Sequence, residues 1–375
     1  MNVKKILWLA PAALVIFILS RLSSWFAEYI LARGIFRIFA VPIGFLTGFL
    51  PFSLAEILLY LTVVTMILLL VKFLFLMTRP GRFEVIRTWG LRFIATVSVL
   101  AFLFTVLCGG LYYRIPMSSQ MNLKVQKYSR EELYQTCLYL ADLANQTKAE
   151  VTQTDDKGVV VVEDMKQLSA DVATAYKNLE KKYPVFRYST GKVKPVLFSR
   201  AMSYTGIVGI YCPFTVEANV NTDVAGYNRA ADAAHELAHL HGFMQENEAN
   251  FISYLACEES DKAYVRYSGI MLGFIYCANA LYEEDQEMHR QLFDGLSEGV
   301  KADLIYENEY WDFMEKSELY EAVETASDKV NDTYLKVNGQ KEGVKSYGRV
   351  VDLLIAYIGT ESKESGQNGT TDETQ

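Results

Sequence analysis

Three apolar runs within the first 113 residues restrict how this 375-residue chain can fold. They cover residues 6–20, 57–77 and 93–113; the last two are long enough to cross a bilayer as helices, and the first nearly so. In hydrocarbon every backbone N–H and C=O group needs an internal partner, so runs of this kind fold as helices. The sequence therefore predicts a membrane region of about three transmembrane helices over residues 1–113.

The segment between the first two runs has a different composition. Residues 24–52 mix aromatic side chains with Arg33, Arg37 and several glycines and prolines. This mixture predicts an interfacial or re-entrant segment rather than a full crossing. No small-x-small cleavage site follows Ser20, so the first run is expected to remain as an anchor.

Basic residues indicate the orientation of these helices. Lysines precede the first run, and arginines crowd the loop between the second and third, and both features are typical of the cytoplasmic side. After three crossings, the chain beyond residue 113 is then expected outside the cytoplasm. The basic residues that carry this argument are Lys4, Lys5, Arg79, Arg82, Arg87 and Arg92, and those that argue weakly against it are Arg21, Arg33 and Arg37.

Charge divides the chain at the same place. Residues 1–113 carry a net charge of +7, and the remainder carries −15. An acidic domain of this kind is not expected to bind nucleic acid or to lie flat on anionic lipid. The five cysteines show no CxxC spacing, so they predict neither a disulfide framework nor a cysteine-based zinc site.

One motif in the acidic part carries chemistry. Residues 235–239 read His-Glu-Leu-Ala-His, the HExxH pattern, after an alanine-rich lead-in and before Gly242, a helix terminator. On a helix His235 and His239 share one face and can bind one zinc ion, with Glu236 beside them. Bound zinc makes water acidic enough for Glu236 to act as general base in hydrolysis.

A zinc site of this type needs a third protein ligand. The stretch that follows, Glu246-Asn247-Glu248-Ala249-Asn250, resembles the second helix of zincin metallopeptidases with a glutamate ligand, which carries Glu-x-x-Ala/Ser-Asp. The resemblance implies one zinc ion per chain held by His235, His239 and Glu246. It also implies that Asn250, in place of the usual Asp, holds a ligand histidine.

Three neighbouring residues leave alternatives open. The gap between His239 and Glu246 is short, so Gly242 must allow a sharp reversal, and Glu248 is the alternative third ligand. In the HExxHxxGxxH branch of zincins the third-ligand position falls on Gln245, which is a poor zinc ligand. His241 lies on another helix face, where a supporting or surface role is expected.

The zincin resemblance also implies a substrate strand and a group that stabilises the transition state. The stretch Phe214-Thr215-Val216-Glu217-Ala218-Asn219 is the candidate edge strand to which an extended peptide would add, although a plain core strand fits it equally well. Candidate stabilisers near the C-terminus are Tyr347 and Arg349, and more weakly Tyr334 and His289.

The expected domain organisation follows from these patterns. Residues 114–359 are predicted to form one mostly α-helical zincin-like domain with a small β-sheet, and residues 360–375, which lack apolar side chains, a disordered tail. The whole layout is similar to an uncharacterised family of bacterial membrane proteins. That resemblance implies an integral protein of the bacterial cytoplasmic membrane with its C-terminal domain outside the cytoplasm.

The leading hypothesis is a membrane-anchored zinc metallopeptidase that acts on envelope proteins or peptides. The alternative is a zincin-type membrane sensor or scaffold with little or no turnover, against which the intact Glu236 argues. An intramembrane protease is disfavoured because charged residues flank the motif and no uncharged run of about 20 residues encloses it. The oligomeric state is not indicated by any pattern.

Overall fold

The computed structural model of the chain describes residues 3–188, 191–337 and 349–368. These residues are mostly helical with one small sheet, as the sequence predicted. The chain begins with a group of apolar helices, and a second set of helices surrounds the sheet. The first group consists of α1 (Val3–Ile6), α2 (Leu9–Leu22), the π-helix η1 (Phe26–Ile35), α3 (Phe36–Thr47), α4 (Leu54–Met77), α5 (Arg82–Leu107) and the short 3-10 helix η2 (Gly109–Tyr113).

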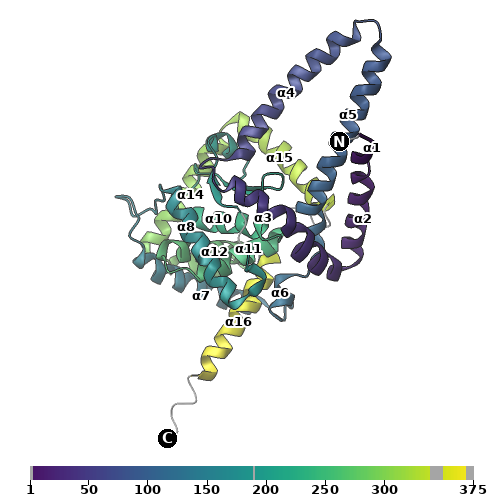
Figure 1. Cartoon of the computed structure of the whole chain (residues 1–375). Helices are drawn as coiled ribbons and strands as arrows, with labels where there is room; N and C mark the ends of the chain where they lie inside the picture. Colours follow the sequence, from purple (N-terminus) through teal and green to yellow (C-terminus); the bar gives the residue numbers. More distant parts are fainter. Residues whose placement is uncertain (1–2, 189–190, 338–348, 369–375) are drawn as a thin grey trace.

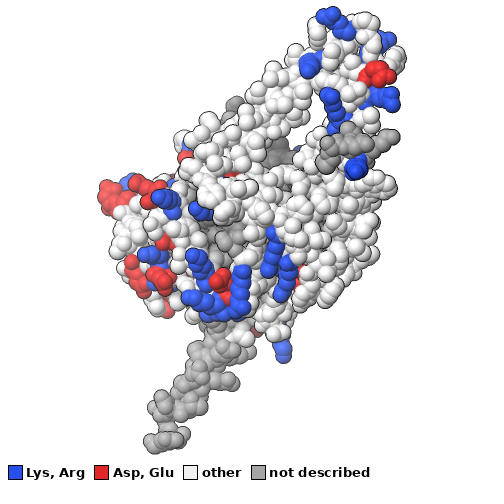
Figure 2. All heavy atoms as spheres, in the orientation of Figure 1, with Lys and Arg blue, Asp and Glu red and all other residues white. Residues whose placement is uncertain are grey.

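Helices α4 and α5 form a hairpin that projects beyond the rest of the chain (Figure 1). None of the residues of α4 is buried, although nearly all of them are apolar. Figure 2 shows that the charged side chains of the hairpin gather at its tip, where Arg79 and Arg82 lie. A mostly apolar shaft with a basic tip is what a pair of helices in lipid requires. By length and composition, α4 and residues 82–113 are two of three candidate membrane spans.

The third candidate span differs from the sequence-based expectation. It is the 22-residue helix Phe26–Thr47, formed by η1 and α3, within the segment expected to be interfacial or re-entrant. Pro42 lies inside α3 without ending it, so the helix is continuous. Residues 6–20, which were expected to span, lie mainly in α2; its 14 residues measure about 21 Å, short of a hydrocarbon core of about 30 Å.

A buried ion pair joins the N-terminal helices to the rest of the fold. Glu28 of η1 is fully buried, and Arg114 donates hydrogen bonds of 2.8 and 3.0 Å to its two carboxylate oxygens. Arg33 donates a third, at 2.8 Å, and the Arg37 guanidinium lies 4.0 Å from the centre of the Tyr188 ring. Helices on both sides of residue 113 also share one hydrophobic core. The Glu28 and Arg37 side chains of the N-terminal helices therefore have their partners in the chain that follows residue 113.

The sheet has three strands, β1 (Val193–Pro195), β2 (Gly209–Cys212) and β3 (Glu217–Val220). Their order is β1-β3-β2, with β1 parallel and β2 antiparallel to the central β3, whose residues are all buried. In β3, Glu217 pairs with Lys194 of β1 at 2.6 Å and accepts hydrogen bonds from the N–H groups of Leu54 and Ala55. Because those N–H groups begin α4, the sheet is fixed to the base of the hairpin.

Helix α10 (Arg229–Leu240) lies at the centre of the remaining helices. Buried alanines let its neighbours approach closely. The Ala231 N–H, which lies in the first turn of α10 and so has no partner within the helix, donates a hydrogen bond to Ser268 of α12 (Ala263–Glu284). Tyr176 of α8 donates a 2.6 Å hydrogen bond to the Ala234 carbonyl. The surrounding helices are α6 (Met117–Gln120), α7 (Arg130–Glu150), α8 (Met165–Lys182), η3 (Pro184–Phe186), α9 (Ser199–Ser203), α11 (Glu246–Glu258), α12 (Ala263–Glu284), α13 (Gln286–Asp294), α14 (Glu298–Glu315), α15 (Glu318–Val337) and α16 (Val350–Asn368).

The C-terminal end corrects one expectation. The prediction of a disordered tail from residue 360 is wrong for residues 360–368, because α16 continues to Asn368 and projects from the body in Figure 1. Buried Val350 and Leu354 anchor the start of this helix, and the good helix formers Glu361 and Lys363 allow it to propagate. Residues 369–375 lie outside the described residues.

The Glu28–Arg114 pair predicts a large effect of a small change. Glu28→Gln removes the negative charge and leaves the buried Arg114 guanidinium poorly compensated, which costs about 3–5 kcal/mol for a buried pair. We expect a clearly lower midpoint of thermal unfolding in detergent. Glu84→Gln, which removes an exposed carboxylate from a 3.8 Å surface pair, is the matched control and should leave the midpoint unchanged. Equal midpoints for the two variants would contradict this role of Glu28.

Candidate metal centre

A left-handed glycine ends α10 and returns the chain toward it. Gly242 has φ of +81°, and the N–H groups of Gly242 and Phe243 donate to the carbonyls of His239 and Ala238 at 2.8 and 3.1 Å. This pattern is the Schellman motif, which requires a residue that tolerates positive φ. Helix α11 then begins at Glu246, directly after the reversal.

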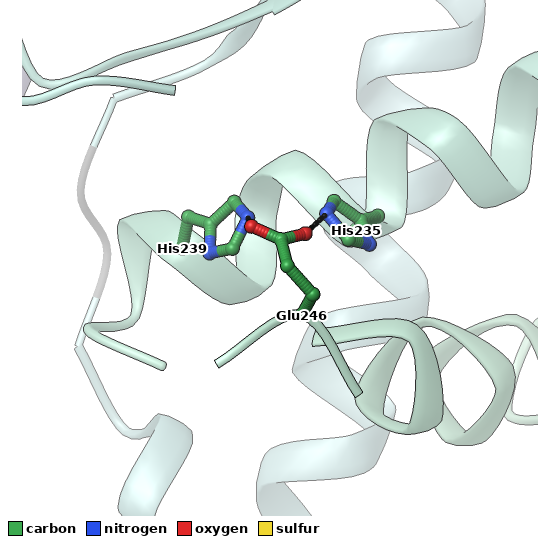
Figure 3. A group of neighbouring side chains, drawn as sticks. All are labelled: His235, His239 and Glu246. Atoms are coloured by element: carbon green, nitrogen blue, oxygen red, sulfur yellow. Dashed lines mark ion pairs between the residues drawn. The ribbon is translucent and has the colours of Figure 1, made fainter. Parts of the chain in front are cut away.

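Three side chains meet in front of this turn. The Nε2 atom of His235 lies 3.1 Å from one carboxylate oxygen of Glu246, and Nε2 of His239 lies 3.7 Å from the other. Figure 3 shows the carboxylate between the two imidazole rings, with Glu246 reaching back from the start of α11. Their possible ligand atoms all lie within 4.8 Å of one another. The structure thus brings together the three ligands expected from the sequence.

The outer nitrogen of each imidazole is held by an oxygen atom. Nδ1 of His239 lies 2.7 Å from the Phe243 carbonyl oxygen, and Nδ1 of His235 lies 2.7 Å from Oδ1 of Asn250. A carbonyl oxygen only accepts hydrogen bonds, so both rings carry a proton on Nδ1, which leaves Nε2, the nitrogen that faces Glu246, as the atom that would bind a metal. Oriented tautomers of this kind are typical of metal-binding histidines. Asn250 occupies the supporting position that the resemblance implied for it.

Without a cation, the charges of Glu246 and the histidines shift one another's pKa values. Burial lowers the pKa of His235, but the hydrogen bond and charge of Glu246 outweigh burial and raise it to about 9. Burial raises the pKa of Glu246, and the charges and hydrogen bonds of the two histidines hold it well below its usual range. A dicationic metal at the same point would satisfy the carboxylate and displace the proton from His235.

The alternative ligands point elsewhere. Glu248 is buried and accepts a hydrogen bond of 2.5 Å from the Met117 N–H group, and burial raises its pKa to about 7. Gln245 donates a 2.7 Å hydrogen bond to the Tyr112 carbonyl. These contacts favour Glu246 over both neighbours as the third ligand.

His241 is buried, so the surface role considered for it is wrong. Its ring stacks on Tyr176 at 5.0 Å between centroids and an interplanar angle of 8°. Burial and the charges of Arg114 and Arg37 lower its pKa to about 3. Its carbonyl accepts hydrogen bonds from Arg114 and from the Tyr188 hydroxyl. The end of the histidine-bearing helix is therefore tied to the same arginine that pairs with Glu28.

Glu236 lies between the cluster and the sheet. Its Oε2 atom is buried and has no hydrogen-bond partner among the described residues. Burial raises the pKa of this carboxyl group to about 7, although the two histidines lower it. A Cβ atom at Gly209 of β2 would collide with the carboxyl group, so glycine at that position leaves the room that Glu236 occupies. A carboxyl group titrating near neutral pH suits a general base.

The cluster opens into a cavity of about 1060 Å³. One wall is β2 with the loop before it, a second is the end of α5 with η2, and a third belongs to α15. Asp232, one turn before His235, also lines the cavity, and burial raises its pKa to about 7. The volume is sufficient for several residues of an extended peptide.

The strand beside the cavity is not the one expected. The interpretation of residues 214–219 as an edge strand is wrong, because Val216 has φ of +51° within a turn and Glu217 begins the central, buried β3. The edge strand on this side is β2, with Ile210 half exposed. Phe214 lines the cavity from the turn, whereas Thr215, Glu217, Ala218 and Asn219 are buried.

Of the four residues expected to stabilise the transition state, the structure describes the side chains of two, and neither of these lies at the cluster. Tyr347 lies outside the described residues, as does the side chain of Tyr334. Arg349 is exposed at the start of α16, and His289 packs against Phe293 on α13 with a ring separation of 4.6 Å; neither lines the cavity.

Sequence reasoning missed the three tyrosines that line the cavity, Tyr112, Tyr211 and Tyr276, of which the last two lie next to His239 and Asn250. The Tyr276 hydroxyl accepts a 3.0 Å hydrogen bond from Nδ2 of Asn250, and burial raises its pKa. The Tyr211 ring lies 6.2 Å from that of His239, and its hydroxyl donates a 3.0 Å hydrogen bond to the Leu107 carbonyl. No local pattern distinguishes these two residues from the other tyrosines of the chain.

The comparison with known proteins places the chain in a family without an assigned activity. A family model described as "Protein of unknown function (DUF3810)" matches residues 31–355, so the chain belongs to that family. The match includes α3 to α5 together with the sheet and α10. No curated protein and no solved structure matched the chain.

The geometry predicts which glutamate binds metal. Zinc-loaded full-length protein should contain close to one zinc ion per chain, and Glu246→Gln should lose most of it because a neutral amide is a poor zinc ligand. Glu248→Gln removes the same charge two residues away and should keep the metal. Elemental analysis after gel filtration distinguishes the two, and metal loss in Glu248→Gln but not in Glu246→Gln would contradict the assignment.

The contact of Asn250 with His235 predicts a smaller effect on affinity. Asn250→Ala removes the oxygen that orients the imidazole, which typically weakens metal binding about 10- to 100-fold. Competition with a fluorescent zinc chelator measures the change. Asn247→Ala, three residues earlier on α11, is the control. Unchanged affinity in Asn250→Ala would show that the ring needs no support from this amide.

Proposed function

We propose that this protein is a membrane-anchored, zinc-dependent peptidase. The observation that carries the proposal is the convergence of His235, His239 and Glu246 beside Glu236, whose buried Oε2 atom has no partner in the part of the chain that the structure describes. Two neutral imidazoles and one carboxylate form the donor set of catalytic zinc sites, in which a position stays open for water or substrate. The orphaned carboxylate oxygen indicates where a reacting water molecule would be held.

Each residue of the site has its own role in the proposed hydrolysis. His235, His239 and Glu246 would hold the zinc ion, which when bound lowers the pKa of water and polarises the scissile carbonyl. Glu236 takes one proton from the attacking water as the new C–O bond forms, and it delivers that proton to the amine nitrogen as the C–N bond breaks. Asn250 and the Phe243 carbonyl keep the imidazoles in the metal-binding tautomer.

The shape of the cavity supports an extended polypeptide as substrate. Strand β2 lies at the edge of the sheet and lines the cavity together with the cluster. An edge strand offers its backbone to a peptide that adds as another strand, while pockets on either side receive alternate side chains. Tyr276 lines the same cavity, and its hydroxyl, which accepts a hydrogen bond from Asn250, keeps its own hydrogen available to stabilise the developing oxyanion.

The membrane helices support an anchor and an orientation. The basic tip of the α4–α5 hairpin is expected on the cytoplasmic side, and the domain with the cluster joins the other end of both helices. The peptidase domain would then lie outside the cytoplasm of a bacterial cell. Helix α10 is not among the candidate spans in the described residues, which disfavours an intramembrane protease.

A sensor or scaffold that binds zinc without turnover is the second candidate function. It is favoured by the chain of contacts from Glu28 through Arg114 to the His241 carbonyl, which links a membrane helix to the end of α10. The Glu236 Oε2 atom, for which the described residues offer no partner, favours hydrolysis, since a scaffold has no use for a general base.

The decisive comparison uses Glu236→Gln. This variant should keep its zinc but lose cleavage of a fluorogenic library of extended peptides by about 100- to 10,000-fold, the usual contribution of a general base. Glu298→Gln, at an exposed carboxylate on α14, controls for the loss of charge and should retain full activity. Zinc-loaded wild-type protein that cuts no member of the library would favour the sensor, and cleavage unaffected by Glu236→Gln would contradict the mechanism.

A further inference from the structure

We infer that the polypeptide cut at this centre is anchored in the same bilayer and is cut close to the outer membrane surface. The inference rests on the proposed hydrolytic function and adds the substrate class. It is carried by the position of the cavity along the membrane helices and by the apolar side chains around its opening.

One wall of the cavity belongs to a membrane helix. Phe104 of α5, Cys108 and Tyr112 line the cavity. A hydrocarbon core of about 30 Å is crossed by about 20 helical residues. Counted from Arg87 or Arg92, the last basic residues after the hairpin tip, the far boundary of the hydrocarbon falls about 20 residues later, between residues 107 and 112. The cavity therefore lies at the level where α5 leaves the bilayer.

The same count along α4 places a second apolar element of the domain at the membrane surface. Counted back from Met77 at the end of α4, about 20 residues reach the neighbourhood of Glu56. The Glu56 carboxylate accepts hydrogen bonds from the N–H groups of Leu197 and Phe198 at 2.7 and 3.0 Å. These two residues are 82% and 55% exposed, and the Phe198 ring contacts Tyr60 of α4. An apolar loop is thus fixed at the expected membrane surface.

Most of the exposed residues that line the cavity are apolar, with Asp328 as a charged exception. Ile210 on β2, Phe214 in the next turn and Val330 on α15 line the cavity and are 51%, 42% and 71% exposed. Exposed apolar surface costs about 25 cal/mol per Å² in water, and contact with lipid or an apolar chain removes that cost. A substrate that leaves the bilayer beside these residues reaches β2 without passing through bulk water.

The chemistry favours a polypeptide over a lipid. An edge strand beside a general base suits an extended backbone with a scissile amide, and a polypeptide anchored by one apolar helix presents such a backbone at this level. Cleavage adds one water molecule across the C–N bond and leaves a membrane-bound carboxylate or amine. Hydrolysis of lipids would contradict the inference.

The position of the opening is tested without activity. A photoreactive benzoyl-phenylalanine replaces Leu197 or Ile210 in full-length protein in lipid nanodiscs. The control position is Leu138, an exposed residue of α7, the helix that Figure 1 shows far from the hairpin. Irradiation should attach lipid at positions 197 and 210 and not at position 138. Absence of lipid adducts at both test positions would overturn the inference, whatever the hydrolytic activity.

Cut sites test the substrate class. The probe is a randomised 30-residue extramembrane segment joined to one apolar helix and placed in the same nanodiscs, with the same segment free in solution for comparison. Mass spectrometry should locate the cuts made by the zinc-loaded protein within about the ten residues nearest the helix. The free segment should be cut at least about tenfold more slowly. Glu236→Gln identifies cuts made by contaminating proteases.

The outcomes separate the two proposals. Cuts spread evenly along the segment, equal cutting of the free segment, or release of fatty acids from the lipid would overturn the membrane inference and leave hydrolysis standing. Lipid adducts with no cut in any segment would overturn the hydrolytic function and the substrate class that depends on it.

Discussion

The reversal of the chain at Gly242 is the constraint on which the proposed metal centre depends. Only a left-handed residue lets the Phe243 N–H bond back to α10 while the chain reverses and begins α11 shortly afterwards. This reversal brings Glu246 to the two imidazoles. The same turn places the Phe243 carbonyl on Nδ1 of His239. Backbone geometry thus positions one ligand and orients another, and a side chain at position 242 would have to adopt the same strained φ beside Arg114.

The membrane region takes part in this arrangement. Arg114, where the chain leaves the last candidate span, joins the Glu28 carboxylate to the His241 carbonyl, and its guanidinium lies 3.8 Å from the centre of the Phe243 ring. Glu217 and Glu56 connect the sheet and the loop after β1 to the start of α4. The start of α4 is therefore fixed to the sheet and to the loop after β1, and the chain after η2 is fixed to the end of α10. The family match likewise spans the membrane helices and the domain together.

Local patterns sufficed for the centre of the site and failed where distant segments meet. The helical period placed His235 and His239 on one face, and the register of residues 246–250 pointed to Glu246 and Asn250. Strand order, by contrast, depends on pairing between segments far apart in the chain, so the sequence could not show that β2 rather than residues 214–219 forms the edge. Tyr276 and Arg114 reach the site through tertiary packing alone, and no spacing in the sequence predicts their positions there.

X-ray absorption at the zinc edge of the full-length protein tests the central claim most directly, because it reports the atoms bound to the metal without reference to any substrate. The account predicts a four-coordinate ion with two imidazole nitrogens at about 2.0–2.1 Å, the remaining ligands oxygen, and no sulfur. Loss of one imidazole in His239→Ala should appear in the same spectrum. A sulfur-coordinated ion, or an ion surrounded by oxygen alone, would contradict it.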